Sequence, residues 1–355
     1  MINNINKESK SKSKKGSNKK KKNKNLSKIN IKNNSNKTQK NSSKLKNIPD
    51  YIKVNSFPEG RIKSYSYYSK PGRNIEGFQK INQDSYLIMP NINGMKDFNI
   101  FGIMDGHGTD GHFISNFVSK YFSKLFKANF NVKENNNLDY INYIIQENNF
   151  ALIKNIFINA EKELNNFNKK NLDPSFSGTT CIILIQIGNR IICANVGDSK
   201  AIMIKTYDRI IPLSIDHKPE LFKESKRILN YGGEICQMEE YGKRIGPFRV
   251  WKKGEKYPGI DISRSIGNTF ATYLGVISTP DIIEKYIDKE TQFIVIMSKG
   301  VSEILSNKEV LDIVYPFYIK NDVKGACQSI IHLASELWYE EEIVIDDTTV
   351  IVIFF

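Results

Sequence analysis

An apolar run that ends abruptly in a carboxylate and an imidazole is the feature that most constrains this chain. Residues 101–108 read FGIMDGHG, so a buried-strand pattern stops at Asp105, Gly106, His107 and Gly108. Glycine lets a backbone approach a ligand closely, Asp is a hard ligand for divalent cations, and His moves protons near neutral pH. An Asp-Gly hairpin turn with an incidental His explains the same residues. This stretch alone leaves both interpretations open.

Other acidic residues also stand beside strongly apolar runs. They are Asp84, Asp198 and the pair Asp346 and Asp347. A carboxylate without a partner is costly in such surroundings. Carboxylates that converge from separate strand ends could hold two divalent cations, which clamp a phosphate and lower the pKa of a water molecule. Taken singly, each Asp is better explained as a turn cap.

The net charge of +14 is located in one segment. Residues 1–49 hold 16 Lys and one Glu, so the remaining 306 residues carry a net charge of about −1. This Lys-, Asn- and Ser-rich segment has too little apolar surface to offset the entropy of ordering, which predicts a disordered tail. Its lysine clusters could direct the chain to the nucleus or contact nucleic acid or an acidic membrane. A solvated tail without a partner is the alternative.

Strand patterns are scattered over the rest of the chain, and helical patterns come in pairs between them. Strands are expected at 64–69, 83–88, 98–104, 179–187, 190–194, 201–204, 293–297 and 349–355. Helices are expected at 113–126, 138–167, 220–231, 308–315 and 323–340. This order predicts one α+β domain over residues 50–355, with helices packed outside a β core.

Cysteine usage and hydropathy indicate an intracellular protein. The four cysteines show no ligand-like spacing and are predicted to be free thiols of a reducing compartment. No apolar run is long enough to span a membrane, and the N-terminus lacks the apolar core of a secretory signal. We expect a monomer in the cytoplasm or nucleus.

The order of short motifs resembles the PPM family, the metal-dependent protein serine/threonine phosphatases also called protein phosphatase 2C. The motifs are INQDSYL (81–87), FGIMDGHG (101–108), SGTT (177–180), ANVGDSKA (194–201), LSIDHKP (213–219), YGGEI (231–235), RVW (249–251), SRSIGN (263–268), GVISTPDI (275–282), VIMSKGVSEILSN (295–307) and DDTTVIVIF (346–354). The resemblance covers about 62–355. It implies a β-sandwich flanked by helix pairs on both sides, with a two-cation Mg²⁺ or Mn²⁺ site at one end.

The resemblance also implies a metal role for four residues. Asp105 would bridge both cations, and the carbonyl of Gly106 would bind one of them through water. Asp346 would complete the ligand set, and Asp198 would bind a weaker third cation.

Two further residues correspond to the family's catalytic positions. His107 would donate a proton to the leaving hydroxyl, and Asp84 would order a metal-bound water. The substrate class would be phosphoserine and phosphothreonine on proteins.

Two residues depart from the expected cation ligands. Lys299 stands in SKG where the family has an Asp that binds the first cation, and Gln83 stands where a Glu is frequent. Glu303, one helical turn after Lys299, could supply a substitute carboxylate. Alternatively, the Lys299 ammonium could lie between Asp105 and Asp346 as a built-in cation.

The expected phosphate contact is also altered. Gln79 stands near the position where the family has a basic residue, so Lys80 or Arg73 could serve instead. Asn268 replaces an Asp that usually follows the SRSxG motif, which we interpret as a smaller loss.

Two functions are therefore weighed. One is metal-dependent hydrolysis of phosphoserine and phosphothreonine proteins, impaired by Lys299. The other is an inactive pseudophosphatase that binds a partner or regulates one. The family has two cation sites, whereas one or none is expected here. An anionic partner of the basic tail is compatible with either function.

Overall fold

The computed structural model describes residues 54–56, 60–130, 138–167, 173–341 and 344–355. The chain divides into two units, Met1–Ile48 and Pro49–Phe355, and the fold below is that of the second unit. The predicted disordered tail at 1–49 lies outside the described residues and stays a prediction.

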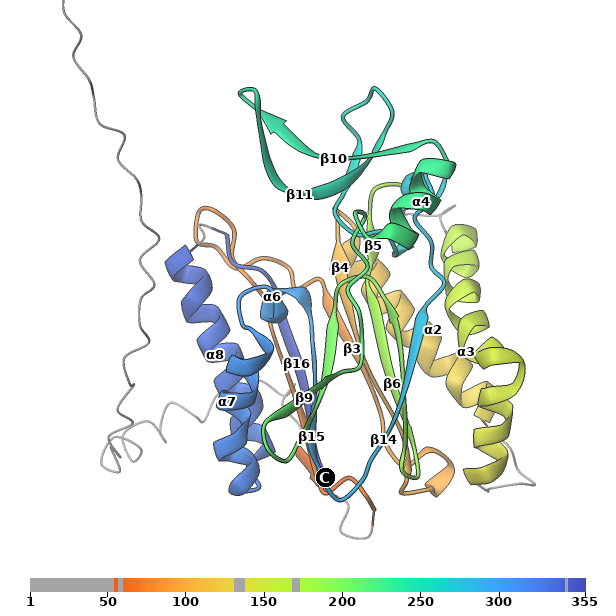
Figure 1. The fold of residues 1–355 in the computed structure, drawn as a ribbon, viewed down its shortest axis with the longest axis vertical. Coiled ribbons are helices and arrows are strands. Elements are labelled where there is room, and N and C mark those ends of the chain that lie inside the picture. Colours follow the sequence, from red (N-terminus) through yellow and green to blue (C-terminus); the bar gives the residue numbers. More distant parts are fainter. Residues whose placement is uncertain (1–53, 57–59, 131–137, 168–172, 342–343) are drawn as a thin grey trace, which may run out of the picture. The chain divides into compact units, whose positions relative to one another are not determined.

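Two antiparallel sheets form the centre of the described fold (Figure 1). The first has the strand order β1-β2-β16-β15-β8-β9. Its strands are Val54–Ser56, Ser64–Lys70, Thr348–Phe354, Thr291–Met297, Lys200–Lys205 and Arg209–Pro212, in that order. The second has the order β13-β5-β4-β6-β7-β14, and β3 pairs with β4. Its strands are Ile266–Gly267, Gly178–Thr179, Phe98–His107, Cys181–Ile187, Arg190–Val196 and Asp281–Tyr286, with β3 at Asp84–Met89.

Strand β4 is buried on both faces, which explains its nearly continuous apolar sequence. Phe101 and Ile103 point into the core between the two sheets, where the Phe101 ring lies 5.0 Å from that of Tyr65. Ile100 and Met104 point the opposite way, into the core beneath the helices. Alternation of side chains along a strand thus serves two cores at once.

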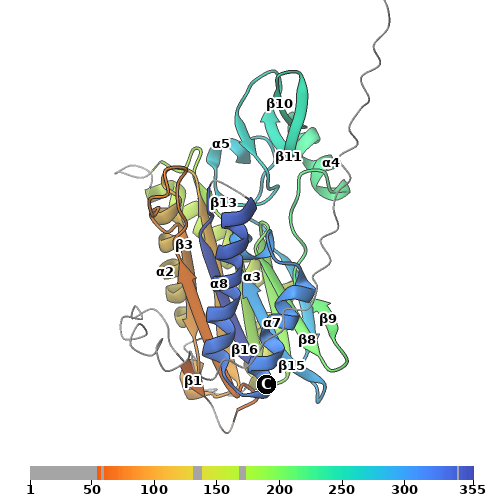
Figure 2. The ribbon, with the colours of Figure 1, turned by 90° about the vertical axis from the view of Figure 1, so that its left-hand side faces the viewer.

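A pair of helices covers the outer face of each sheet (Figures 1 and 2). Helices α2 (Gly111–Phe130) and α3 (Leu138–Phe167) pack on the second sheet, and α7 (Asn307–Ile319) and α8 (Val323–Glu341) on the first. Helix α3 is interrupted by non-helical dihedral angles at residues 147–150, which the sequence pattern did not predict. The predicted β-sandwich between helix pairs is confirmed.

A small third sheet stands at one end of the sandwich (Figure 2). It consists of β10 (Gly233–Glu240), β11 (Lys243–Lys252) and β12 (Pro258–Ile260), and helix α4 (Phe222–Asn230) packs against it. The sequence analysis did not predict β10 or β11, because most of their residues are exposed or half-buried and do not alternate cleanly. Short helices α5 (Thr269–Thr272) and α6 (Lys299–Ser302) and the 3₁₀ turn η2 (Ile92–Gly94) complete the described elements.

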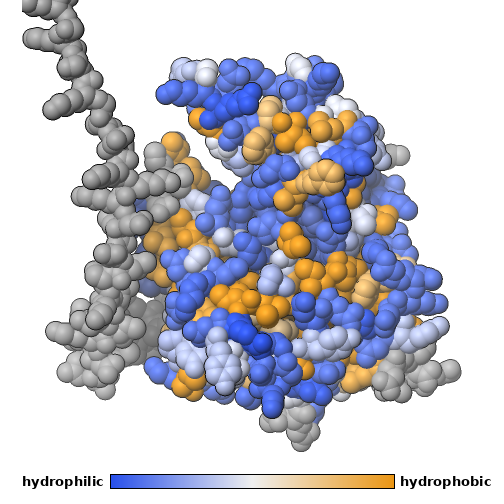
Figure 3. Space-filling model, viewed as in Figure 1, coloured by the Kyte–Doolittle hydropathy of each residue, from blue (hydrophilic) through white to orange (hydrophobic). Residues whose placement is uncertain are grey.

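One face of the described surface is mostly polar. Hydrophilic residues dominate the face shown in Figure 3, and they separate its hydrophobic areas. Within the described ranges, no helix combines the length and apolar character that a membrane crossing requires. The four cysteines are free, and three of them are buried, namely Cys181, Cys193 and Cys327.

Candidate active site

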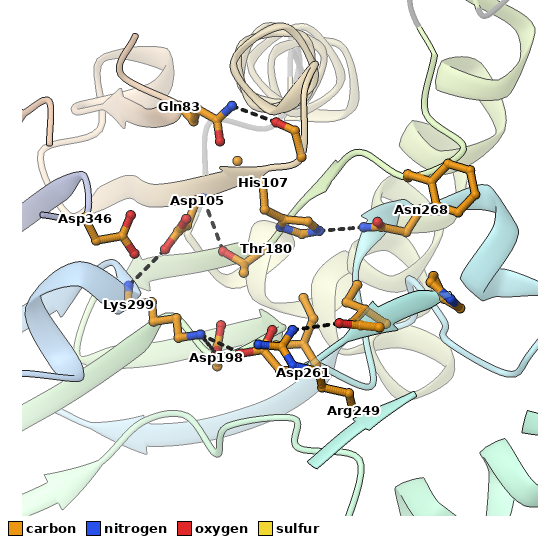
Figure 4. A pocket seen from close by; sticks show the side chains of 17 residues that line it. Gln83, Asp105, His107, Thr180, Asp198, Arg249, Asp261, Asn268, Lys299 and Asp346 are labelled. Carbon is orange, nitrogen blue, oxygen red and sulfur yellow. Dashed lines mark hydrogen bonds and ion pairs between the residues drawn. The ribbon is translucent and has the colours of Figure 1, made fainter. Parts of the chain in front are cut away.

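A pocket of about 300 Å³ contains most of the residues that the sequence analysis proposed (Figure 4). They are Gln83, Asp105, Gly106, His107, Asp198, Lys299 and Asp346. The other proposed residues do not line this pocket. They are Arg73, Lys80, Asp84 and Glu303.

The sheets bring these residues together because several strands begin or end at the same edge. Asp84 at the start of β3 pairs with Asp105 near the end of β4. Asp346 lies just before β16, and Lys299 begins α6 just after β15. Gly106 is required by packing, since a Cβ there would lie 2.4 Å from the Gly111 carbonyl oxygen.

Asp105 is held firmly in the pocket wall. Its carboxylate accepts a hydrogen bond of 3.0 Å from the backbone N–H of Lys299. Its own N–H donates to the Thr180 hydroxyl at 3.2 Å. Burial raises the pKa of Asp105 well above its usual range, and the carboxylates of Asp84 and Asp346 raise it further. The cluster therefore favours a cation at this place.

Asp84 and Asp347, unlike Asp105, do not line the pocket. Asp84 is buried and accepts a hydrogen bond of 2.6 Å from the Thr349 hydroxyl, while its second oxygen has no hydrogen-bond partner. Burial raises the pKa of Asp84 to about 7. Asp347 accepts from the backbone N–H groups of Gly72 at 2.6 Å and Gln83 at 2.9 Å, which anchors the loop before β3. Asp347 is therefore a structural residue, as the turn-cap interpretation predicted.

The Lys299 ammonium lies on the other side of the pocket, away from the gap between Asp105 and Asp346 (Figure 4). Its Nζ is 2.7 Å from Asp261 Oδ2 and 3.8 Å from Asp198 Oδ2. Burial raises the pKa of Asp261, but Lys299 outweighs this effect and lowers it to about 2. The structure thus favours a Lys299–Asp261 ion pair over the alternative of a built-in cation between Asp105 and Asp346.

Asp261 was missed by the sequence analysis. The available signal was an acidic residue between two isoleucines, immediately before the SRSIGN motif. Lys218, in the LSIDHKP motif, was also missed, and its Nζ lies 2.6 Å from Asp198 Oδ2. Asp198 therefore already has two ammonium neighbours, Lys218 and Lys299.

Glu303 lies beside the ammonium rather than in the pocket. Its Oε2 is 3.9 Å from Lys299 Nζ, and its side chain is 52% exposed. Its role as a substitute cation ligand stays a prediction that these contacts do not support.

His107 lies opposite the ion pair and contacts Asn268. The Asn268 side-chain nitrogen lies 2.5 Å from His107 Nε2 and 2.9 Å from the Ser265 hydroxyl oxygen. Burial lowers the pKa of His107, which favours a neutral ring. Asn268 therefore places an amide directly on the imidazole proposed as the proton donor.

The cations around the pocket differ from those that the sequence analysis selected. Lys80 Nζ lies 3.4 Å from Asp346 Oδ1, so it contacts one oxygen of a proposed cation ligand. The Arg73 guanidinium lies 5.7 Å from the centre of the Tyr339 ring, outside the pocket. Arg249 does line the pocket, and it donates to the Gly259 carbonyl at 2.7 Å. Arg249 belongs to the RVW motif, which by itself assigns it no role.

The residues present do not fit a two-cation centre. Among the described residues, no group of three or more His, Cys, Asp and Glu side chains could hold a metal ion. The Asp198 carboxylate contacts the ammonium groups of Lys218 and Lys299, which makes it less available to a cation. Asp105 and Asp346 remain as a pair of carboxylates that faces the pocket (Figure 4).

Comparisons of sequence identify relatives of this chain. The family model described as Protein phosphatase 2C matches residues 70–337. "Probable protein phosphatase 2C 35" of Arabidopsis thaliana is 29% identical over 307 residues, which cover 81% of this chain and 83% of the relative. "Probable protein phosphatase 2C 34" of the same plant is 30% identical over 291 residues, which cover 79% of this chain and 78% of the relative.

Solved structures share the fold. The serine-threonine phosphatase 2C from Toxoplasma gondii superposes with a TM-score of 0.70 at 16% identity, covering 87% of this chain and 100% of that chain. A C. elegans sex determining protein gives a TM-score of 0.63 at 16% identity, covering 83% of this chain and 65% of that chain. Because the family model matches residues 70–337, which are most of the domain, this chain belongs to the protein phosphatase 2C family.

Proposed function

We propose that this chain binds phosphoserine and phosphothreonine proteins and hydrolyses their phosphate esters at a strongly reduced rate. The observation that carries this proposal is the position of the Lys299 ammonium. It pairs with Asp261 and Asp198, so the carboxylates of Asp105 and Asp346 still face the pocket. This pair, with the carbonyl of Gly106, would hold one Mg²⁺ or Mn²⁺. A bound cation would supply charge neutralisation of the phosphate and a lower pKa of water.

The side chains of the pocket support the remaining tasks. The His107 ring would donate a proton to the leaving hydroxyl only in its protonated form, which burial disfavours, and this adds to the reduced rate. Arg249 is the pocket cation best placed to contact a phosphate oxygen, because Lys80 is engaged by Asp346. The second oxygen of Asp84, which lacks a hydrogen-bond partner, would accept from a water molecule.

The reduced rate follows from the charge at position 299. At ~4 Å and an effective dielectric near 20, an ammonium and a divalent cation would repel each other by about 8 kcal/mol. The effect is smaller here because the Lys299 ammonium lies on the other side of the pocket from the gap between Asp105 and Asp346 (Figure 4). Asp261 offsets much of this repulsion, since it lies 2.7 Å from the ammonium. Even a third of the full effect weakens cation binding by roughly two orders of magnitude.

The test is calorimetry with Mn²⁺, together with hydrolysis of a phosphothreonine peptide. We expect the wild type to bind one cation, and Lys299→Asp to raise Mn²⁺ affinity at least about tenfold and the hydrolysis rate with it. Lys308→Asp is the matched control, because Lys308 is 56% exposed on α7 and does not line the pocket. Two tight Mn²⁺ sites in the wild type, or no gain in Lys299→Asp, would contradict the proposal.

A pseudophosphatase is the second candidate function. It is favoured by Asp198, whose carboxylate is already paired with Lys218 and Lys299 and so offers little to a cation. Wild-type protein that binds the phosphopeptide, yet neither binds Mn²⁺ nor hydrolyses the ester, would establish this function in place of the first. Lys299→Asp would then serve as the gain-of-function control.

The proposal also covers the cellular compartment, the partners and the oligomeric state of the protein. Three buried free thiols support a reducing compartment, the cytoplasm or the nucleus. A phosphoprotein would be the substrate or partner, the protein would act as a monomer, and the basic tail could contact an anionic partner.

A further inference from the structure

Three aromatic rings stand together at the rim of the pocket. Phe176 stacks on Phe270, with ring centres 5.5 Å apart and planes inclined by 16°. Tyr257 meets Phe270 edge-on at 5.0 Å and lies 6.3 Å from Phe176. We call these three residues the aromatic shelf.

The aromatic shelf adjoins the pocket directly. Phe176 lines the pocket, as does Pro258, the neighbour of Tyr257. A Cβ on Gly108 would lie 2.5 Å from the Phe176 carbonyl oxygen, so the Phe176 backbone packs against the residue after His107. The aromatic shelf is therefore adjacent to His107, the proposed proton donor.

The segments of Phe176 and Phe270 are joined by backbone hydrogen bonds, and the shelf is incompletely covered. The backbone N–H of Phe270 donates to the Ser175 carbonyl at 3.2 Å, and that of Thr269 donates to Pro174 at 2.9 Å, which ties the two aromatic segments together. Phe270 packs against the small core beneath β11 and α4. Phe176 by contrast remains 52% exposed. A large ring that is fixed and exposed beside a pocket is a typical anchor site for a partner side chain.

Lysines predominate at the outer edge of the shelf, where Glu255 lies among them with its Oε1 3.8 Å from Lys252 Nζ. Lys252 Nζ lies 5.5 Å from the Tyr257 ring centre and 3.2 Å from its hydroxyl. Lys253 and Lys256 are exposed in the same connection between β11 and β12. Arg249 lines the pocket itself. This arrangement complements an anionic peptide.

We propose that the aromatic shelf binds an aromatic side chain adjacent to the phosphoresidue of a phosphopeptide. This inference rests on the proposed function, because the phosphate must enter the pocket. Consecutive Cα atoms are about 3.8 Å apart, so a residue next to the phosphoresidue reaches the rim. A pocket of about 300 Å³ receives the phosphorylated side chain, while its neighbour lies against Phe176 outside it.

The test uses fluorescein-labelled phosphothreonine peptides in the presence of Mn²⁺, read by fluorescence anisotropy. One peptide carries Phe immediately before the phosphothreonine, a second carries it immediately after, and a third has Ala at both positions. We expect one of the Phe peptides to bind the wild type about tenfold more tightly than the Ala peptide. The unphosphorylated Phe peptide should bind much more weakly.

Variants assign the preference to the shelf. Phe176→Ala should bring the Phe-to-Ala affinity ratio close to one, and Phe176→Leu should leave an intermediate ratio. Tyr207→Ala is the control, because Tyr207 is 91% exposed outside the pocket and should leave the ratio unchanged. Thermal melting checks that each variant is folded.

Equal affinities of the wild type for all three phosphopeptides would overturn the inference and leave the proposed function standing. Retention of the preference in folded Phe176→Ala would overturn the assignment to the shelf. Equal binding of the unphosphorylated Phe peptide would show docking unrelated to the pocket. Failure of every phosphopeptide to bind would overturn the proposed function and this inference together.

Discussion

At residue 299, an ammonium stands where a carboxylate was expected, and the protein compensates for it with another side chain. Asp261 lies 2.7 Å from Lys299 Nζ, and the side chains are 19% and 27% exposed. A buried or half-buried charge is tolerated when a partner of opposite sign is close. Lys299 and Asp261 therefore form a unit, and the effect of changing one depends on the presence of the other.

Asp261→Ala tests this unit. Removal of the carboxylate leaves the Lys299 ammonium with only the more distant Asp198 and Glu303, so we expect a loss of about 1–3 kcal/mol in the free energy of unfolding. Chemical denaturation followed by circular dichroism measures it. Glu303→Ala is the control and should change stability by less than about 0.5 kcal/mol.

The same pair can be measured as a coupling energy. A double-mutant cycle with Lys299→Met should show that Asp261→Ala costs much less once the ammonium is absent. An equal cost of Asp261→Ala in both backgrounds would mean that Asp261 stabilises the fold through other contacts.

Among the elements, helix α4 is tied to the sandwich by a buried charge cluster. Glu224 accepts a hydrogen bond of 2.7 Å from Arg264, another of 2.6 Å from Arg227 and a third of 2.7 Å from the Ser263 hydroxyl. Arg264 also donates to Asp281 at the start of β14. The cluster therefore connects α4, the SRSIGN segment that holds Asn268, and the second sheet.

The cluster predicts a pH dependence of stability. Burial raises the pKa of Glu224, but the hydrogen bonds from Arg264, Arg227 and Ser263 outweigh burial and lower it from 4.5 to about 2. A carboxyl group whose pKa is lowered on folding stabilises the protein above its unfolded pKa, and this contribution is lost as pH falls through the folded value. Wild type should exceed Glu224→Gln in stability at neutral pH.

The difference between wild type and Glu224→Gln should shrink as pH falls from about 4.5 to about 2. Denaturant titrations of both proteins at several pH values measure it. Glu290→Gln is the control, since Glu290 pairs with Arg209 at a more exposed place, where its side chain is 39% accessible. A difference that is constant over this range would exclude Glu224 as the titrating group.

At the scale of the whole molecule, the net positive charge is concentrated in one segment of the sequence. The basic residues that give the net charge are concentrated at 1–49, whereas the rest of the chain is almost neutral. Such a composition contributes little apolar surface to a core. Deletion of residues 1–49 should therefore change the melting temperature by less than about 2 °C. This corresponds to a change of less than about 1 kcal/mol in the free energy of unfolding.

Calorimetry of the full chain and the shortened chain measures this. The shortened chain should also lose any affinity for anionic partners that falls steeply with salt, because counterion release drives such binding. A melting temperature lowered by more than a few degrees would show that the segment packs on the domain.

The sequence by itself determined the family, the order of most elements and the core. Apolar periodicity is a local property, and it correctly located β4, β6, β15 and the helices that flank them. Asp105, His107, Asp198 and Asp346 were selected by motif order, and all four line one pocket, while their roles stay predictions. The exposed hairpin of β10 and β11 was missed because its residues bury too little to produce a clear pattern.

Only the tertiary structure decided where the long side chains reach. From the sequence, the Lys299 ammonium could lie between Asp105 and Asp346. In the structure it instead binds Asp261, 38 positions away in the sequence. Arg249 rather than Arg73 lines the pocket, and Phe176 meets Tyr257 and Phe270 from different segments. The physical reason is that flexible side chains are placed by contacts between distant segments. Such contacts leave no periodic trace in the order of residues.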